Sequence, residues 1–483
     1  MVEHERERND MTICLFGCGK YYRRYHHLFD GMQVAAIIDN FSSAKSLDGL
    51  PILRPDKLVE FNFDRIYLLV EKDFPVYQQL MRLGVPCEKI VRVHDLFRLK
   101  GFPCFSFPSA GRREKECRGR GMLISNGFSR TGAPMVLTSA ASILRDHGYD
   151  VTVFSPSDGP LHQWYDRQGI SVVIDPEMRL GRLDCLPWKE FDFVWVNTIL
   201  FAYLLQRRRC QITIFWWIHE AEKFYADMDL CLTENEWKKV HAFCVSELAA
   251  RNFCRLVPGG SRHMEGIFPY GIPDVAGKTG EFQPHETMVF AIVGTLGRIK
   301  GQAFFLSVWR KRFLSDASVE LWLIGSGTKG EELQEIQIAA RDCRNVRFLG
   351  ELSHDAVCKL YSEIDILVCP SQDDPLPVVA TEAMMNYRPC LVSDHTGTAD
   401  FITHGVDGWV FRAGDARDLE DKLLDVVAQK EHLSEMGRQA RLCYEKYFSY
   451  DAFERRVLKA AQYLMKGWDA GLSHSMMRGS RNV

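Results

Sequence analysis

An apolar run at residues 364–370 is the feature that most restricts the fold of this chain, because a loop and a stretch of small residues follow it directly. Short runs rich in β-branched residues are typical of buried parallel strands. The following segment, from about Pro377 to Met385, is predicted to be a helix. A strand, a loop and a helix in this order form the unit of an open α/β sheet, in which ligands bind at the carboxyl ends of the strands.

Two acidic residues occupy that edge of the predicted sheet. Asp374 lies in the loop after the strand, and Glu382 lies in the first turns of the helix. The helix start, at Val378 and Val379, offers free N–H groups and a positive dipole end that are suited to phosphate. We therefore interpret Asp374 as a group that holds sugar hydroxyls and Glu382 as a group that holds a ribose. An acid-x7-acid spacing arises by chance in many chains, so its weight comes from the elements around it.

Length and composition limit the class of protein to which this chain can belong. With 483 residues and 46% hydrophobic content, the chain is expected to form two or three domains with sizeable cores. A net charge of −3 argues against a general nucleic-acid binder. No apolar run approaches the length of a membrane span, and the charged first ten residues do not resemble a secretory signal. The 15 cysteines are scattered, which favours reduced thiols in a cytoplasmic protein over disulfides or a zinc site.

Alternating strand and helix patterns predict an α/β architecture with parallel sheets. The predicted parts are a small Rossmann-like βαβ domain, a linker, two larger Rossmann-like domains and a C-terminal amphipathic helix, at residues 11–100, 101–120, 121–280, 281–450 and 451–470. The linker contains Pro, Gly, Ser and a basic run, and we interpret it as solvated. The basic run is also compatible with acidic lipid head groups, which would give a peripheral contact with a membrane.

A glycine-rich loop, GTLGRIKG at 294–301, follows one predicted strand and opens a helix. Glycines such as Gly294 let the backbone approach a ligand closely, and Lys300 is placed to reach a diphosphate. An ordinary turn with solvated basic residues is the alternative, and it would be preferred if this motif stood alone. A second glycine turn, at Gly325, is predicted to form a wall of the same pocket or to be a common turn.

The domain at 121–280 contributes two further candidates. Gly132 lies in a loop that leads into an amphipathic helix, and His219 ends a Trp-rich strand. A histidine at a strand end is placed to bind a sugar hydroxyl or an acceptor, and a structural role is an equal alternative. The Asp-x-Asp pattern at 227–229 follows a helical stretch rather than a strand, so we interpret it as a solvated loop and predict no metal.

Taken together, residues 364–394 and 288–302 resemble the retaining family-4 glycosyltransferases, in which two Rossmann-like domains face a cleft (GT-B type). The donor motif of that family reads Glu-x7-Glu, and its first acid is Asp374 here. Lys300 and Gly301 match the family's Gly-Arg-Leu-x3-Lys-Gly phosphate motif. Thr295 stands at its arginine position, and Arg298 is expected to supply the missing cation.

The resemblance implies the function and the roles of these residues. It implies transfer of a sugar from a nucleotide-diphosphate sugar to a glycan or lipid-linked acceptor, without a metal or a further cofactor, in the assembly of a cell-surface polysaccharide or glycolipid. Residues 281–450 would bind the donor, 121–280 would face the acceptor, and the last helix would cross back to the middle domain. His219 corresponds to a strand-end histidine beside the reacting sugar, and Gly132 to the family's first glycine-rich loop.

The N-terminal domain carries GCGKYY at 17–22, and Asp39 follows near the ~20-residue spacing of a dinucleotide fingerprint. Tyr22 replaces the third glycine and would crowd the contact between helix and strand. The block is similar to small Rossmann-like domains attached to sugar-modifying enzymes. We predict a structural or docking module for a protein partner rather than a nucleotide site.

Two other functions remain open from the sequence. A nucleotide-sugar epimerase shares the two-domain architecture, and it would convert the donor to an isomer without any acceptor. A non-catalytic sugar-binding or partner-binding module would bind the donor without turnover.

Overall fold

The computed structural model describes residues 11–70, 73–92, 105–107, 117–175, 178, 188–202, 205, 212–225, 232–276, 282–327 and 330–466. The chain divides into two compact units. One unit comprises Met1–Phe105 and Asp175–Cys185, and the other comprises Ser106–Ile174 and Leu186–Val483. Within the described ranges, no helix is both long and apolar enough to cross a bilayer.

The N-terminal unit contains a six-stranded sheet with the order β3-β4-β2-β1-β5-β6. Its strands are parallel except for β3, which pairs with β4 in the antiparallel sense. Apolar side chains form separate clusters that pack around its strands and helices. This arrangement agrees with the Rossmann-like domain that the sequence predicts. The elements are β1 (Thr12–Phe16), α2 (Lys20–Tyr25), β2 (Gln33–Ile38), β3 (Ser46–Leu47), β4 (Leu50–Leu53), β5 (Arg65–Leu68), α3 (Asp73–Arg82) and β6 (Ile90–Arg92).

The Asp39 carboxylate in this unit is held by backbone groups. It accepts hydrogen bonds from the N–H of Cys18 at 3.0 Å and from those of Phe41 and Ser42 at 2.8 Å each. Burial alone would raise the pKa of Asp39, but these donors outweigh it and lower the pKa. The acid therefore ties the loop after β1 to the loop after β2.

The second unit contains an eight-stranded sheet with the order β14-β13-β12-β11-β8-β9-β10-β7. The pairings from β14 to β10 are parallel. Trp195, Trp216 and Trp217 are fully buried in it. Strand β7 (Phe105–Phe107) lies within the range predicted as linker, and strand β8 (Arg120–Ile124) begins at the last residue of that range. The other elements are α5 (Gly132–Asp146), β9 (Asp150–Ser155), α6 (Leu161–Arg167), β10 (Ser171–Ile174), β11 (Phe193–Val196), β12 (Thr213–Ile218), α8 (Glu234–Trp237), β13 (Val240–Cys244), α9 (Glu247–Leu256), α10 (Gly260–His263) and β14 (Met264–Ile267).

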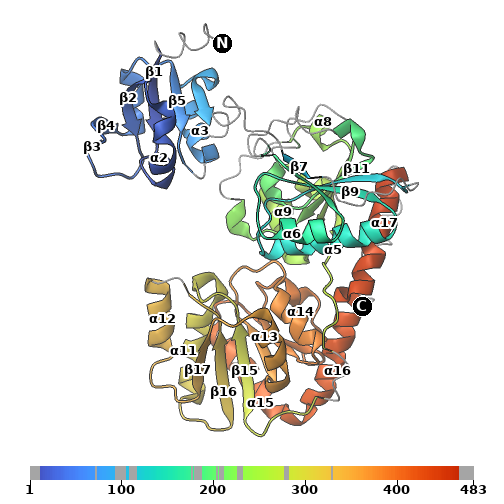
Figure 1. The fold of residues 1–483 in the computed structure, drawn as a ribbon. Coiled ribbons are helices and arrows are strands. Elements are labelled where there is room, and N and C mark those ends of the chain that lie inside the picture. The colour runs from blue at the N-terminus through green and yellow to red at the C-terminus, as the bar shows by residue number, and fades with distance from the viewer. Residues whose placement is uncertain are drawn as a thin grey trace. The chain divides into compact units, whose positions relative to one another are not determined.

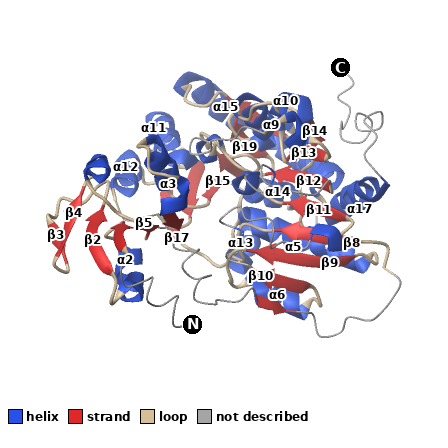
Figure 2. Ribbon diagram, turned by 90° about the horizontal axis from the view of Figure 1, so that it is seen from above, coloured by secondary structure: helices blue, strands red, loops and turns tan. Residues whose placement is uncertain are grey.

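A third sheet, of six parallel strands, has the order β17-β16-β15-β18-β19-β20. The sequence predicts five of these strands; β20 (Gly408–Phe411) is the addition. Helices flank the strands of the sheets (Figure 2). The remaining elements are β15 (Met288–Val293), α11 (Gln302–Phe313), β16 (Val319–Ile324), α12 (Glu331–Ala339), β17 (Val346–Gly350), α13 (His354–Leu360), β18 (Ile366–Cys369), α14 (Val378–Met385), β19 (Cys390–Ser393), α15 (Ala416–Ala428) and α16 (Leu433–Cys443).

The final helix, α17 (Tyr450–Lys466), crosses back to the middle domain, as expected from the resembled fold. It packs against α5, β11 and β12 (Figure 1). Phe453 stacks on Trp217 with ring centroids 5.7 Å apart. The Arg456 guanidinium donates to the Pro269 carbonyl oxygen at 3.0 Å. Apolar packing and a partly buried cation therefore hold this helix on the middle domain.

Candidate functional site

The third sheet reverses its strand order between β15 and β18, and ligands in open α/β sheets bind at such a point. The loop after β15 carries the glycine-rich motif, and the loop after β18 carries Asp374. The structure brings the two loops into contact, because the Gln372 N–H donates to the Ile299 carbonyl oxygen at 2.7 Å. Gly301 has a φ of +72°, and a Cβ atom there would overlap the Pro370 carbonyl oxygen. This close approach requires glycine.

Lys300 and Asp374 form an ion pair at this contact. The Lys300 Nζ lies 2.5 Å from the Asp374 Oδ2, and the two side chains are 38% and 12% exposed. Burial disfavours the ammonium, but the adjacent carboxylate outweighs it and raises the pKa of Lys300. Lys300 therefore remains charged at neutral pH. The cation predicted to hold a diphosphate and the acid predicted to hold a sugar meet at one point.

The backbone fixes the position of Asp374. Its N–H donates to the His395 carbonyl oxygen at 3.1 Å, and its carbonyl oxygen accepts from the Gly397 N–H at 2.8 Å. Gly397 has no room for a Cβ atom, because the Pro375 carbonyl oxygen occupies that space. The loop after β18 is thus tied to the loop after β19. A side chain on such a backbone is held in one place.

Glu382 lies on α14 and is only 6% exposed. Its Oε1 lies 2.7 Å from the His354 Nε2, and its Oε2 accepts from the Tyr361 hydroxyl at 3.0 Å. Neither partner was predicted from the sequence; His354 is the first residue of α13 and follows its N-cap residue, Ser353. Within the described residues, Glu382 has no hydrogen bond to Lys300 or Asp374. The second acid therefore occupies a separate subsite, between α14 and α13.

The remaining donor-side candidates take different places. Arg298 is 65% exposed and pairs with Glu335 of α12 at 2.7 Å, so its guanidinium faces that helix. The Thr295 carbonyl oxygen accepts from the Gln302 side chain at 3.0 Å. Gly294 and Gly325 lie against each other, because a Cβ atom at Gly325 would overlap the Gly294 carbonyl oxygen. The two glycine turns therefore form one continuous surface at the ends of β15 and β16.

His219 follows β12 on the middle domain. Its Nε2 lies 3.0 Å from the Asn197 Oδ1, and the Asn197 Nδ2 donates to the Ala133 carbonyl oxygen at 2.7 Å. Ala133 is next to Gly132, the first residue of α5. The structure thus brings together the histidine and the glycine loop that the sequence singled out separately. Burial lowers the pKa of His219 to about 3, so the imidazole is neutral.

Glu220, the residue after His219, has a structural role. Its buried carboxylate accepts from the Thr198 hydroxyl, from the Ile199 N–H at 3.1 Å and from the His219 N–H at 3.0 Å. Burial raises the pKa of Glu220, and these donors counter that effect. The carboxylate therefore locks the loops after β11 and β12 together.

The middle domain contacts the Asp374 loop directly. The Glu222 N–H donates to the Asp373 Oδ2 at 2.7 Å, and the Tyr270 hydroxyl donates to the Leu376 carbonyl oxygen at 2.6 Å. Burial raises the pKa of Asp373. The strand-end edges of the second and third sheets therefore meet around residues 373–376. No hydrogen bond joins His219 to Lys300 or Asp374 within the part of the chain that the structure describes.

Metal ligands are not grouped in the described residues: no cluster of three or more His, Cys, Asp or Glu side chains could hold an ion there. Asp227 and Asp229 lie outside these residues. The cysteines that the structure describes carry free thiols.

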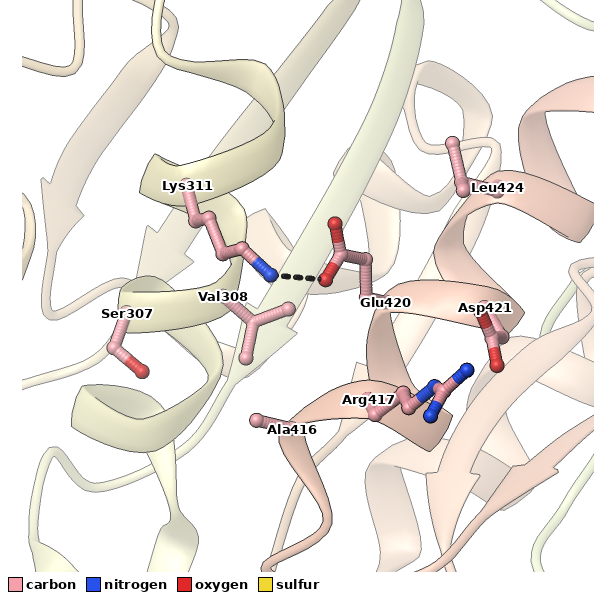
Figure 3. A pocket seen from close by; sticks show the side chains of 8 residues that line it. All are labelled: Ser307, Val308, Lys311, Ala416, Arg417, Glu420, Asp421 and Leu424. Atoms are coloured by element: carbon pink, nitrogen blue, oxygen red, sulfur yellow. Dashed lines mark hydrogen bonds and ion pairs between the residues drawn. The ribbon is translucent and has the colours of Figure 1, made fainter.

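A cavity of about 560 Å³ lies between α11 and α15 (Figure 3). The Lys311 Nζ and the Glu420 Oε2 form an ion pair there at 2.6 Å. None of its lining residues belongs to the loops described above, so it is not part of the candidate site.

Comparisons with known proteins agree with this geometry. The crystal structure of Anabaena HepE in complex with UDP-glucose shares the fold with a TM-score of 0.55 and 15% identity, over 71% of this chain and 99% of that chain. The family model described as Glycosyl-transferase family 4 matches residues 118–255. The model described as Glycosyl transferases group 1 matches residues 278–442. The chain belongs to the family-4-like glycosyltransferases of GT-B type.

Curated relatives match parts of this chain. It is 34% identical over 132 residues to an uncharacterised glycosyltransferase of Methanocaldococcus jannaschii, covering 27% of this chain and 33% of the relative. It is 29% identical over 168 residues to the sulfoquinovosyl transferase SQD2 of Arabidopsis thaliana, covering 34% of this chain and 31% of the relative. The chain therefore spans about a third of the length of these two relatives.

Proposed function

We propose that this protein is a retaining glycosyltransferase that moves a sugar from a nucleotide-diphosphate sugar to a glycan or lipid-linked acceptor. The observation that carries the proposal is the Lys300–Asp374 pair at the point where the strand order reverses. The similar fold of Anabaena HepE, which was crystallised with UDP-glucose, supports a nucleotide-sugar donor.

Electrostatics would provide most of the catalysis. Departure of the diphosphate builds negative charge on the leaving group, and a nearby cation stabilises that charge. Lys300 would turn from Asp374 to the diphosphate, and the N–H groups at Val378 and Val379 would add to it. The N-cap residue of α14, Pro377, makes no side-chain cap. We assign no covalent nucleophile.

The proposed setting is the cytoplasm, at the inner face of a membrane where a cell-surface polysaccharide or glycolipid is assembled. The free thiols support a reducing compartment. The N-terminal unit is proposed to dock a protein partner. Tyr22 stands at the third glycine position of the dinucleotide fingerprint and is buried, which supports a docking role over a nucleotide site.

A screen of nucleotide sugars tests the function. Thermal stabilisation of the protein identifies the nucleotide and sugar, and slow donor hydrolysis then reports on the chemistry without knowledge of the acceptor. Release of free sugar and nucleoside diphosphate supports a transferase. Conversion of the donor to an isomer would show an epimerase instead, and binding without any turnover would show a binding module.

The two acids are predicted to act on different parts of the donor. E382Q should weaken binding of the free nucleoside diphosphate by roughly tenfold, because the ribose would lose a charged acceptor. D374N should leave that affinity intact or raise it, because Lys300 loses a competing carboxylate, and it should lower kcat. Calorimetry with the nucleoside diphosphate and steady-state rates separate the two effects. An equal loss of nucleotide affinity in both variants contradicts the assignment of Asp374.

Activity is predicted to survive removal of divalent ions. Lys300 and the start of α14 supply the positive charge that a metal would otherwise bring to the diphosphate. The measurement is donor turnover before and after dialysis against EDTA. Loss of turnover that Mn²⁺ or Mg²⁺ restores would refute this prediction and direct attention to Asp227 and Asp229.

A further inference from the structure

The side-chain amide of Asn197 connects His219 to the start of α5. Its oxygen contacts the His219 ring, and its nitrogen donates to the Ala133 carbonyl oxygen. We infer that Asn197 fixes the tautomer of His219, so that Nε2 carries the proton and Nδ1 is an acceptor reserved for a hydroxyl of the donor sugar. Asn197 is thus a positioning residue for the reaction. The part concerning the sugar rests on the proposed function, whereas the part concerning the tautomer does not.

The tautomer of His219 follows from which atoms can donate a hydrogen bond and which can only accept one. The Ala133 carbonyl oxygen can only accept, so the group 2.7 Å from it must be the amide NH₂ of Asn197. The Asn197 Oδ1 then faces the His219 Nε2 at 3.0 Å. An amide oxygen also can only accept, so Nε2 must donate. Asn197 is 0% exposed, so water does not compete for these bonds.

The protein environment keeps the ring neutral. Burial lowers the pKa of His219 to about 3, and a neutral imidazole with a proton on Nε2 has a lone pair on Nδ1. Trp217 packs beside the ring with centroids 4.3 Å apart. Among the described residues, none forms a hydrogen bond with Nδ1, and the side chain is only partly buried. His219 can therefore accept a hydrogen bond from a hydroxyl at Nδ1, but it cannot serve as a cation for the diphosphate.

The loops around the pair are rigid enough to hold this geometry. Glu220 accepts from the Thr198 hydroxyl and the Ile199 N–H on one loop, and from the His219 N–H on the other. The Glu220 carboxylate therefore holds Thr198 and Ile199, which follow Asn197, close to the backbone of His219. Glu220, the titratable neighbour of His219 in the chain, directs its oxygens into these bonds. The tautomer therefore depends on Asn197 and not on a charged group.

The test is ¹⁵N NMR of the full chain labelled at histidine, with the His219 signals assigned by their loss in H219Q. We expect the ¹⁵N shifts of a neutral ring protonated at Nε2, constant from pH 5.5 to 8. N197A should change these shifts toward a mixture of tautomers. N197D should make the His219 signals titrate in that range, because a carboxylate partner favours the charged imidazolium.

The matched control is N252A, which removes a buried asparagine from α9 of the same domain. Its His219 signals should equal those of the native chain. In donor turnover, N197A should lower kcat by roughly tenfold or more with a smaller change in the Kd of the free nucleoside diphosphate. A donor analogue that lacks the bound hydroxyl should be less sensitive to N197A than the full sugar, which a merely structural role of Asn197 would not produce.

Three results would overturn the inference: a proton on Nδ1 of His219 in the native chain, His219 signals that titrate with an ordinary pKa, or unchanged signals in N197A. The NMR result does not depend on turnover. Absence of any glycosyl transfer together with the expected spectra would therefore reject the proposed function and leave the tautomer assignment standing. If N197A does not fold, N197D keeps a side chain of nearly equal volume, and His219 signals that fail to titrate in it would contradict the inference.

Discussion

Replacement of Lys300 by alanine is expected to lower kcat/KM for the nucleotide sugar roughly 30- to 150-fold, which corresponds to about 2–3 kcal/mol of transition-state binding. The ammonium lies at the switch point of the donor-side sheet, 2.5 Å from the Asp374 carboxylate. Its removal would leave the developing charge of the diphosphate without this cation and would leave Asp374 without its partner. The measurement is the initial rate of donor consumption over a range of donor concentrations.

Lys311 provides the matched control for this substitution. It lies on α11, is 70% exposed and pairs with Glu420 outside the candidate site. K311A should leave kcat/KM within about twofold, because exposed ion pairs contribute little. K300R should recover part of the lost rate, since it keeps the charge with a different geometry. An unchanged kcat/KM in K300A would show that the phosphate assignment is wrong.

A comparable loss is expected for Gly301→Ala, although this residue contributes no chemical group. Its φ of +72° strains an alanine by about 1–2 kcal/mol, and overpacking costs about 1–3 kcal/mol more. The added methyl overlaps the Pro370 carbonyl oxygen, so the loop that carries Asp374 must move. We expect kcat/KM to fall at least tenfold and hydrogen exchange to quicken in residues 297–301 and 370–374.

Gly405→Ala separates strain from overlap. Gly405 also has a positive φ, +77°, but a Cβ atom there meets nothing within 4 Å. This variant should lose a similar amount of stability from strain alone and keep kcat/KM within about twofold. Equal activity of the two glycine variants would mean that the contact between the two loops does not hold the donor site together.

Local patterns in the sequence predicted the elements of the donor domain well. The small-residue stretch predicted as a helix from about Pro377 to Met385 is α14 (Val378–Met385), and the apolar run before it contains β18. These features depend on neighbours in the chain, which is why periodicity and turn residues reveal them. Strand β20 was not predicted; its sequence, GWVF, lies between glycine turns and contains a single β-branched residue.

The sequence by itself determined the fold class, the family resemblance and the placement of Lys300, Asp374, Glu382 and His219 at strand ends or on the following helix. Only the tertiary structure decided what each side chain meets. Lys300 and Asp374 are 74 positions apart and form a pair, whereas Arg298 turns to Glu335. The partner of His219 is Asn197, a residue that no local pattern distinguishes. Long polar side chains have several reachable partners, and the choice depends on which loops the sheet order brings to one edge, which is a property of the whole fold.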